Sequence, residues 1–267
     1  MENKLIEKIN NGQQVIGTFD ATGSDTIVEI MGYNQYDYVI LDTEHGPYDI
    51  ETAQRLIRTA RMVDLPALVR VKDSQRNSIL KMLDAGALGI IIPNVHSVDE
   101  VKEIVKYGKY APIGERGFGP NSGNEYLTAE YAQHGMDKFF DYKNEETLII
   151  PQCETVGAAE NIEEIVNLDG VDGIFIGPYD LSVALGVPGE TTGPEVMAVV
   201  DRVLKACKKA GKYSFIYTNS IEDSKAKLEL GFDAICYSMN VLHFSESAAN
   251  IVKELKQIDT NTDIKLY

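Results

Sequence analysis

The sequence predicts an α/β fold, a (β/α)8 TIM barrel with an additional C-terminal helix. Eight short apolar runs alternate along the chain with stretches of helical periodicity, which is the pattern of a parallel sheet covered by helices. The length of 267 residues suits one such barrel, which usually takes about 200–250 residues. No GxGxxG motif follows the first run, and this disfavours a dinucleotide-binding open sheet.

The eight predicted strands are rich in β-branched residues and are apolar on both faces, as buried parallel strands are. They cover residues 15–19, 37–42, 66–71, 88–92, 148–152, 172–176, 213–217 and 233–237. They are spread over the whole length, and no linker or low-complexity segment separates them. Residues 1–267 are therefore expected to form a single barrel domain.

The connections between the predicted strands carry helical patterns. Val196, Val200, Val203 and Cys207 recur at helical spacing in 195–210, after a proline suited to the first turn, so this face, with Cys207, is expected in the core. About 55 residues separate the fourth and fifth strands, and a connection of that length is expected to be functional or to carry helices of its own. The segment 241–257 predicts a last amphipathic helix, and 258–267 reads as a polar tail.

The charge balance excludes several classes of partner. With 41 acidic and 25 basic residues the formal charge is −16, so no basic stripe is available for nucleic acid or for an anionic membrane. No apolar run approaches the roughly 18 residues that span a bilayer. The first ten residues do not resemble a signal peptide, and the three cysteines form no CxxC pair, so a cytoplasmic protein with small-molecule partners is expected.

Ionisable and amide side chains gather where the predicted strands end, at the edge that forms the active-site mouth of a barrel. They are Asp42, Glu44 and His45 after the second strand, Arg70 in the third, Gln152 and Glu154 at the fifth, and Asp180 after the sixth. Each alone has an ordinary structural explanation, such as a helix cap or an internal salt bridge. Together, in an otherwise apolar barrel, they predict an active site.

The residue types suit chemistry on an enolate. Glu154 and Asp180 offer hard oxygen ligands that fit Mg2+ or Mn2+, and Arg70 fits a carboxylate or an oxyanion beside the metal. His45, with Asp42 three residues earlier, suits an acid/base pair. Schiff-base chemistry is less favoured, because the one lysine near the end of a predicted strand lies just beyond Arg70.

These residues lie in motifs that resemble those of the HpcH/HpaI aldolase family, the metal-dependent class II pyruvate aldolases. The resemblance runs from about residue 17 to the final helix, and the motifs follow the family order. They are LDTEHGP (41–47), the strand ending at Arg70, LDAGALGIIIPNV (83–95), GERGFG (114–119), PQCET (151–155) and GPYDLSVALG (177–186). Each motif alone is weak, and the ordered set is specific.

The resemblance implies a carbon–carbon lyase, a metal-dependent aldehyde-lyase that reversibly cleaves a 4-hydroxy-2-oxo acid into pyruvate and an aldehyde through a metal-stabilised enolate. It implies a divalent cofactor, Mg2+, Mn2+ or Co2+. It also implies a homo-oligomer, with C-terminal helices exchanged within dimers and the dimers assembled into a hexamer.

Carried over residue by residue, the resemblance gives Glu154 and Asp180 as metal ligands. His45 with Asp42 would be the acid/base pair, and Arg70 would stabilise the pyruvate enolate.

The remaining roles concern the bound 2-oxo acid. The resemblance implies contacts from Gln152 and from the backbone at Tyr179 and Asp180, and it gives Glu44 a role in supporting a metal-bound water.

The sequence departs from the family pattern on the side of the aldehyde. The segment after GERGFG runs PNSGNEYLTAEY, and the last two predicted strands carry YSFIYTNS (213–220) and CYSMN (236–240). We expect Tyr217 and Tyr237 to project at or near the mouth, so the aldehyde half of the site is altered while the pyruvate half is intact.

Two alternatives stay open at this point. One is a carbon–carbon lyase acting on an acyl-CoA thioester of the malyl- or citryl-CoA type, with Lys72 and Arg116 as the candidates for its phosphates. The other is a non-catalytic sensor that binds a 2-oxo acid, for which a catalytic residue should be missing; none is.

Overall fold

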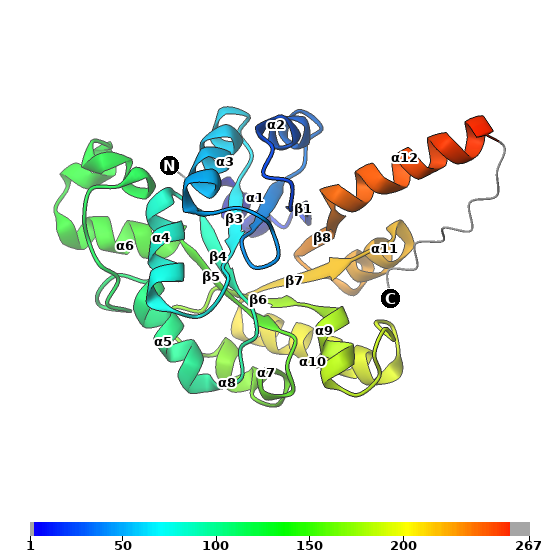
Figure 1. Cartoon of the computed structure of the whole chain (residues 1–267). Coiled ribbons are helices and arrows are strands. Elements are labelled where there is room, and N and C mark those ends of the chain that lie inside the picture. The colour runs from blue at the N-terminus through cyan, green and yellow to red at the C-terminus, as the bar shows by residue number, and fades with distance from the viewer. Residues whose placement is uncertain (1–2, 257–267) are drawn as a thin grey trace.

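The computed structural model describes residues 3–256 and shows a closed barrel of eight parallel strands in the order β1 to β8 (Figure 1). The strands are β1 (Val15–Asp20), β2 (Tyr38–Asp42), β3 (Ala67–Arg70), β4 (Gly89–Ile92), β5 (Leu148–Cys153), β6 (Gly173–Ile176), β7 (Tyr213–Thr218) and β8 (Ala234–Met239). Each predicted run coincides with an observed strand to within two residues. The TIM barrel is confirmed.

Helices surround the barrel on its outer side (Figure 1). The α-helices are α1 (Lys4–Asn10), α2 (Asp25–Tyr33), α3 (Ile50–Met62), α4 (Arg76–Ala85), α5 (Val98–Gly108), α6 (Met136–Glu146), α7 (Val156–Glu160), α8 (Ile162–Val166), α9 (Pro178–Ala184), α10 (Pro194–Ala210), α11 (Ile221–Leu230) and α12 (Asn240–Lys256). Two 3-10 helices, η1 (Ser122–Leu127) and η2 (Glu130–Gln133), lie with α5 and α6 in the long connection. That connection therefore carries its own helices, and α10 buries Cys207 as expected.

Strand side chains alternate between the inside of the barrel and the helical layer. Tyr38 and Ile40 of β2 belong to an inner cluster with Leu68, Ile150 and Phe175, whereas Val39 and Leu41 pack outward against helices. Continuing this period of two along β2, β3 and β5 places the last polar residues of these strands on the inner face. The alternation that places apolar side chains inside the barrel therefore also places polar and charged side chains at its carboxyl end.

A β-bulge interrupts the alternation at the end of β8. Gly17 pairs with Cys236, but Phe19 pairs with Met239, so β8 holds one extra residue in this step. Ser238 adopts a left-handed backbone with φ of 51°, as expected where an extra residue is accommodated. The shift returns Met239 to the inner side, where it packs against the inner cluster.

Helix α12 starts directly after β8 and extends away from the barrel (Figure 1). It presents large apolar side chains to solvent, with Phe244 76 % and Leu255 80 % exposed. The predicted last helix is confirmed up to Lys256. The predicted polar tail, 258–267, lies outside the described residues.

A buried ion pair lies at the amino-terminal end of the barrel. The Nζ of Lys109 lies 2.8 Å from Oδ2 of Asp172 and donates to the carbonyls of Asn144 and Thr147 at 2.6 and 2.5 Å. Thr147 and Asp172 directly precede β5 and β6, so this contact ties two strand starts together. All three ammonium hydrogens have acceptors.

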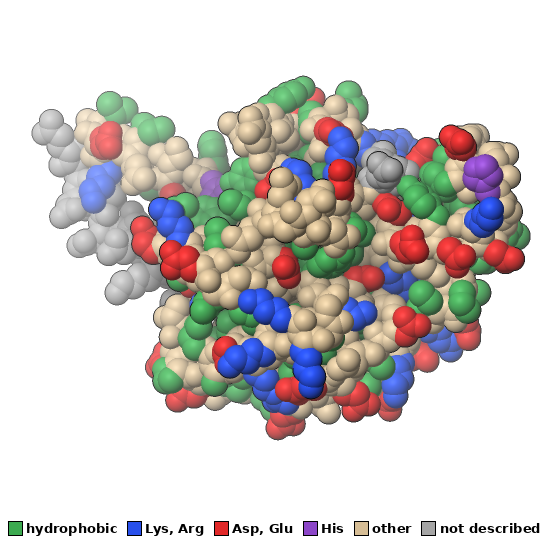
Figure 2. Space-filling model, turned by 180° about the vertical axis from the view of Figure 1, so that it is seen from behind, with side chains coloured by type: hydrophobic (Ala, Val, Ile, Leu, Met, Phe, Trp, Pro, Cys, Tyr) green, Lys and Arg blue, Asp and Glu red, His purple; other side chains and the backbone are tan. Residues whose placement is uncertain are grey.

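Acidic and basic side chains are interspersed over the face shown in Figure 2, and no continuous basic stripe crosses it. Within residues 3–256, no helix combines the length and the apolar character that crossing a membrane requires.

Candidate active site

A cavity of about 670 Å³ opens at the carboxyl ends of the strands, the end at which barrels place their active sites. It is lined by Phe19, His45, Arg70, Gln152, Phe175, Gly177, Pro178, Tyr179, Asp180, Val183, Pro188, Gly189, Tyr217, Met239 and Leu242. Its size is within the range of about 300–1,000 Å³ that holds small-molecule ligands. Most of the predicted site residues are therefore brought to one cavity.

Arg70 is held at the wall of the cavity by two acidic neighbours. Its Nε and Nη2 donate to the two carboxylate oxygens of Asp42 at 2.9 and 2.7 Å, and its Nε lies 3.3 Å from Glu44. Asp42 and Arg70 are partners in the register of β2 and β3, so the sheet itself sets this bidentate contact. Burial opposes the charge of Arg70, but the hydrogen bonds and charge of Asp42 outweigh it and raise the pKa of the guanidinium.

Glu154, just beyond β5, is a buried carboxylate with directed partners. Its Oε1 accepts the backbone N–H of Asn94 at 2.6 Å, and its Oε2 accepts from the amide of Gln152. Gly177 lies so close that a Cβ there would come within 2.9 Å of Glu154, which explains the glycine of the GPYD motif. Burial, with the charges of Asp180 and Glu44, raises the pKa of Glu154 to about 7.

The acidic groups fit a divalent cation. Asp180, in the first turn of α9, is exposed to the cavity and close enough to Glu154 and Glu44 to raise the pKa of both carboxyls, although burial is the larger cause. The Oε1 of Gln152 is buried and has no hydrogen-bond partner. In residues 3–256 no group of three or more His, Cys, Asp or Glu side chains is arranged so that it could hold a metal ion by itself. A cation bound by Glu154 and Asp180 would therefore take its other ligands from water or substrate, as Mg2+ sites commonly do.

His45 has a different partner from the one expected. Its ring is exposed at the mouth, and its Nε2 lies 3.8 Å from Oε2 of Glu44. Asp42 contacts His45 through the backbone N–H of His45, at 3.4 Å, while both carboxylate oxygens of Asp42 face Arg70. The expected pair of His45 with the Asp42 carboxylate is not formed, because the neighbouring strand supplies a bidentate cation.

The two tyrosines expected at the mouth lie on opposite sides of the barrel wall. Tyr217 lines the cavity and lies 5.8 Å, ring to ring, from Tyr179. Tyr237 packs outside, with its ring stacked at 5.4 Å on His243 of α12. The expectation for Tyr237 is wrong, because Cys236 takes the inner position opposite Tyr217.

The structure also removes Arg116 as a phosphate ligand. It is buried, its Nη2 donates to Asp84 at 3.0 Å, and its guanidinium covers the ring of Tyr110 at 4.7 Å. Lys72 is exposed and lies 3.9 Å from Asp73, outside the cavity lining. In the part of the chain that the structure describes, Arg70 is the one lysine or arginine in that lining, so this lining offers few cations for the phosphates of a CoA thioester.

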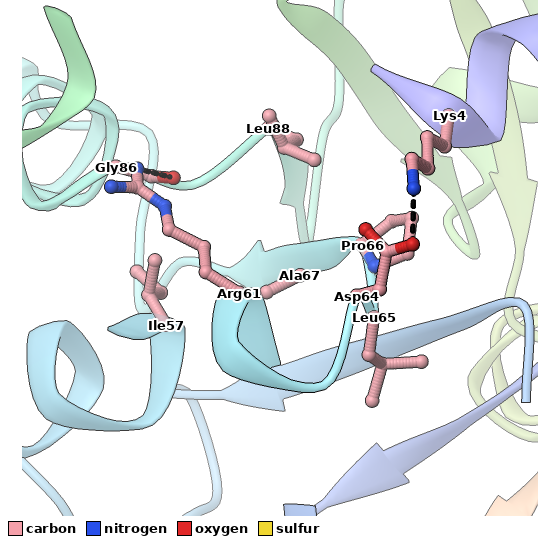
Figure 3. Close-up of a pocket in the computed structure, with 9 residues that line it drawn as sticks. All are labelled: Lys4, Ile57, Arg61, Asp64, Leu65, Pro66, Ala67, Gly86 and Leu88. Atoms are coloured by element: carbon pink, nitrogen blue, oxygen red, sulfur yellow. Dashed lines mark hydrogen bonds and ion pairs between the residues drawn. The ribbon is translucent and has the colours of Figure 1, made fainter. Parts of the chain in front are cut away.

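A second, much smaller cavity of about 40 Å³ lies at the opposite end of the barrel, beside the starts of β3 and β4. Figure 3 shows that its two cations are already engaged: Arg61 donates to the carbonyl of Gly86 at 3.0 Å, and Lys4 is paired with Asp64. A space of that size holds about one water molecule, so this cavity belongs to the packing.

Sequence reasoning missed residues that complete the site. The apolar wall residues Val183, Pro188 and Leu242 come from a loop and two helices whose approach to the mouth has no signal in the sequence, and Met239 is turned inward by the bulge in β8. Asn94 had a usable signal, since it follows a proline at the end of the fourth predicted strand. Its left-handed backbone, with φ of 53°, accompanies the hydrogen bond from its N–H to Glu154.

Comparisons with known proteins agree over nearly the whole chain. The sequence model of the HpcH/HpaI aldolase/citrate lyase family matches residues 16–246. The hydroxypyruvate/pyruvate aldolase of Roseobacter denitrificans is 28 % identical over 96 % of this chain and 98 % of that protein. A 2-keto-3-deoxy-L-rhamnonate aldolase of Escherichia coli is 26 % identical over 92 % and 91 %. The crystal structure of an HpcH/HpaI aldolase from Desulfitobacterium hafniense superposes with a TM-score of 0.88, at 30 % identity over 96 % and 98 % of the two chains.

Proposed function

The chain belongs to the HpcH/HpaI aldolase/citrate lyase family and is a carbon–carbon lyase, and from this premise we propose that it reversibly cleaves a 4-hydroxy-2-oxo acid into pyruvate and an aldehyde. The resemblance inferred from the motifs is thereby confirmed. The roles of individual residues are part of the proposal. The observation that carries it is Arg70, locked by Asp42 and facing a cavity that Glu154 and Asp180 adjoin.

Glu154 and Asp180 are the proposed ligands of a divalent cation. Mg2+ or Mn2+ suits their hard oxygens, and the raised pKa of Glu154 reflects carboxylates that crowd together in a buried place. When bound, the cation supplies Lewis-acid polarisation of the 2-oxo group. The orphaned Oε1 of Gln152 can accept a hydrogen bond from a water molecule beside it.

Arg70 is proposed to bind the 2-oxo acid and to stabilise the developing enolate. Two of the five N–H donors of a guanidinium are used on Asp42, so the others remain for oxygens of the substrate. The charge is permanent, and the bidentate contact with Asp42 fixes its position before substrate arrives. A pre-oriented donor stabilises charge that develops in the transition state without reorganisation.

His45 is proposed as the group that moves the proton. In cleavage it takes the proton of the C4 hydroxyl, directly or through water, as the C3–C4 bond breaks, its electron pair passes to the pyruvate enolate and the aldehyde leaves. The enolate then takes up a proton at C3 to give pyruvate. In the reverse direction it returns the proton to the aldehyde oxygen. Glu44 lies beside this ring, with its Oε2 3.8 Å from Nε2 of His45.

The test is deuterium exchange at the methyl group of pyruvate, followed by NMR in D2O with and without Mg2+ or Mn2+. This half-reaction needs no aldehyde. We expect metal-dependent exchange in the wild type and none in Glu154→Gln, with Glu160→Gln on the exposed end of α7 as a matched control that behaves as the wild type. Absence of exchange with either metal overturns the proposal.

We also propose that the protein is a homo-oligomer in the cytoplasm, with each barrel a single domain. The exposed apolar side chains of α12 would be covered by exchange of this helix between two copies, since monomers rarely expose contiguous apolar surface. The three cysteines are free and buried, as in proteins of reducing compartments. Light scattering of the full chain and of Phe244→Asp/Leu255→Asp tests the assembly, which the double substitution should weaken.

A further inference from the structure

The cavity described above is divided by chemistry into two halves. The polar half contains His45, Arg70, Gln152 and Asp180, and the proposed function uses all four, for pyruvate, for the metal or for moving the proton. The remaining wall is apolar and comes from several elements of the barrel. It is formed mainly by Phe19, Val183, Pro188, Tyr217, Met239 and Leu242; we call these six residues the acceptor wall.

The acceptor wall contains no charged side chain, and its one side-chain hydrogen-bonding group is the hydroxyl of Tyr217. Among residues 3–256, Arg70 is the one lysine or arginine that lines the cavity, and its Nε and Nη2 are bonded to Asp42. An aldehyde carrying a carboxylate would have to bury that charge against Phe19, Tyr217 and Met239. Burying an unpaired charge is costly, so such an aldehyde is disfavoured.

Aromatic rings give the wall a defined surface. Phe19 lies 6.2 Å from Tyr217 and 5.9 Å from Phe175, ring centre to ring centre, and Tyr217 continues to Tyr179 at 5.8 Å. The hydroxyl of Tyr179 accepts from the amide of Asn219, which satisfies its polar atom outside the cavity lining. The rings are thus left as an apolar face for a ligand.

The bulge in β8 contributes Met239 to this face. In a regular strand Met239 would follow the outward phase of Ile235 and Tyr237, but the shift against β1 turns it inward. A thioether side chain adapts to irregular apolar ligands and contacts aromatic rings favourably. The cavity of about 670 Å³ leaves ample room for a large substituent beside pyruvate.

We propose that the acceptor aldehyde carries an uncharged, apolar substituent of branched-aliphatic or aromatic size, selected by the acceptor wall. This inference rests on the proposed function and adds its substrate class. In the aldol direction the enolate carbon of pyruvate forms a bond to the aldehyde carbon, and the aldehyde oxygen takes up a proton to become the C4 hydroxyl. The substituent on the aldehyde stays against the wall throughout.

A matched pair of aldehydes tests the selection. 4-Methylpentanal and succinic semialdehyde have the same chain length and a terminal group of similar shape, but the first ends in an isopropyl group and the second in a carboxylate. With pyruvate fixed, we expect kcat/KM to favour 4-methylpentanal by about 10–100-fold. Equal use of the two aldehydes, or preference for the charged one, overturns the proposal.

A cation placed on the wall should change the preference. Val183 lines the cavity but is 63 % exposed, so Val183→Arg is tolerated by the fold. We expect kcat/KM for succinic semialdehyde, relative to that for 4-methylpentanal, to rise by about tenfold or more. Ala184→Arg, on the next and also exposed residue outside the lining, is the matched control and should leave the ratio unchanged. An unchanged ratio in Val183→Arg would count against the wall as the selector.

A binding experiment separates this inference from the proposed function. Pyruvate exchange reports the enolate step alone, so its absence rejects the aldolase proposal without touching the wall. Saturation-transfer NMR with the unreactive alcohols 4-methylpentan-1-ol and 4-hydroxybutanoate reports the wall without any turnover. Signal from the apolar alcohol alone supports the inference, and equal or stronger signal from 4-hydroxybutanoate overturns it.

Discussion

Lys109 and Arg70 are buried cations at opposite ends of the same barrel, and each is paired with a carboxylate. Lys109 lies 2.8 Å from Asp172 at the strand starts, and Arg70 lies 2.7 Å from Asp42 at the strand ends. Two backbone carbonyls take the remaining hydrogens of Lys109. Arg70 instead keeps unused donors beside a cavity of about 670 Å³.

The difference shows how one fold separates stability from function. At the amino-terminal end all three hydrogens of the Lys109 ammonium have acceptors within the protein, and the 40 Å³ cavity there has no room for a ligand. At the other end donors and acceptors, including Oε1 of Gln152, are left for something that is not protein. Satisfied buried polar groups stabilise the fold, and an unsatisfied group beside a cavity large enough for a ligand is available to bind one.

The largest effect is expected at the functional end, from His45→Ala. Loss of a general acid/base lowers kcat by about 10²–10⁴, whereas the binding of Mn2+, followed by electron paramagnetic resonance, should be retained. Lys72→Ala, an exposed neighbour of Arg70 outside the lining, is the control. Full turnover in His45→Ala would show that another group moves the proton.

At the opposite end, Lys109→Met should reduce stability and leave chemistry alone. Removing one partner of a buried pair strands Asp172, which costs about 3–5 kcal/mol in free energy of unfolding. Urea denaturation measures this, and kcat/KM per folded molecule should be unchanged. Lys205→Met removes an exposed pair with Asp201 and should cost less than about 0.5 kcal/mol. Equal stabilities of the two variants would contradict the comparison.

Arg70→Lys tests whether the guanidinium is needed for more than its charge. A lysine keeps the positive charge but loses the planar fork, so we expect kcat/KM to fall by about 10²–10³ with little change in urea stability. Arg202→Lys alters a similar bidentate contact, to the exposed Glu163, and should change neither quantity. A fully active Arg70→Lys would mean that charge alone suffices.

A second buried lysine, Lys143, should make the free energy of unfolding depend on pH. Burial, with the charges of Arg116 and Arg61, lowers the pKa of Lys143 to about 8, below its value in the unfolded chain, about 10.4. Between these values the unfolded state binds a proton that the folded state does not, so stability contributed by this site rises with pH. Relative to Lys143→Met, the wild type should gain about 2 kcal/mol from pH 8 to 10. A difference that is constant with pH, measured by urea denaturation, would refute this.

The smallest effect is expected from Tyr237→Phe. Tyr237 packs on the outer side of the barrel against His243, so kcat/KM should stay within about twofold of the wild type. Tyr217→Ala, which removes a ring from the cavity lining, should lower kcat/KM for the aldehyde more than it slows pyruvate exchange. A large fall in kcat/KM in Tyr237→Phe would contradict this and indicate that Tyr237 acts at the active-site mouth.

The fold was predictable because parallel strands buried on both faces leave a plain record in the sequence. The period of two within each run also places Asp42, Arg70, Gln152 and Glu154 on the inner side, at the carboxyl ends. The extended runs and their order along the chain therefore predict which side chains lie together at the carboxyl end of the barrel.

Which of these side chains form hydrogen bonds and ion pairs with one another was not predictable. Asp42 is three residues from His45 and 28 from Arg70 along the chain, yet Arg70 is its register partner on the next strand. A fixed bidentate contact across the sheet outweighs proximity in sequence. Tyr237 and Met239 were missed for a related reason, because a single bulge in β8 changes which residues face inward.

Closure of the barrel makes β8 and β1 neighbours, so Phe19, Tyr217, Met239 and Leu242 form one continuous arc although they come from the two ends of the chain. The residues proposed for pyruvate and metal occupy the other arc, from β2 to α9. Three of the six acceptor-wall residues, Tyr217, Met239 and Leu242, therefore follow every residue proposed for pyruvate and metal along the chain. Recombination between relatives near residue 205 would exchange this half of the wall in one event and leave the residues proposed for the enolate intact, which is a direct route to new aldol products.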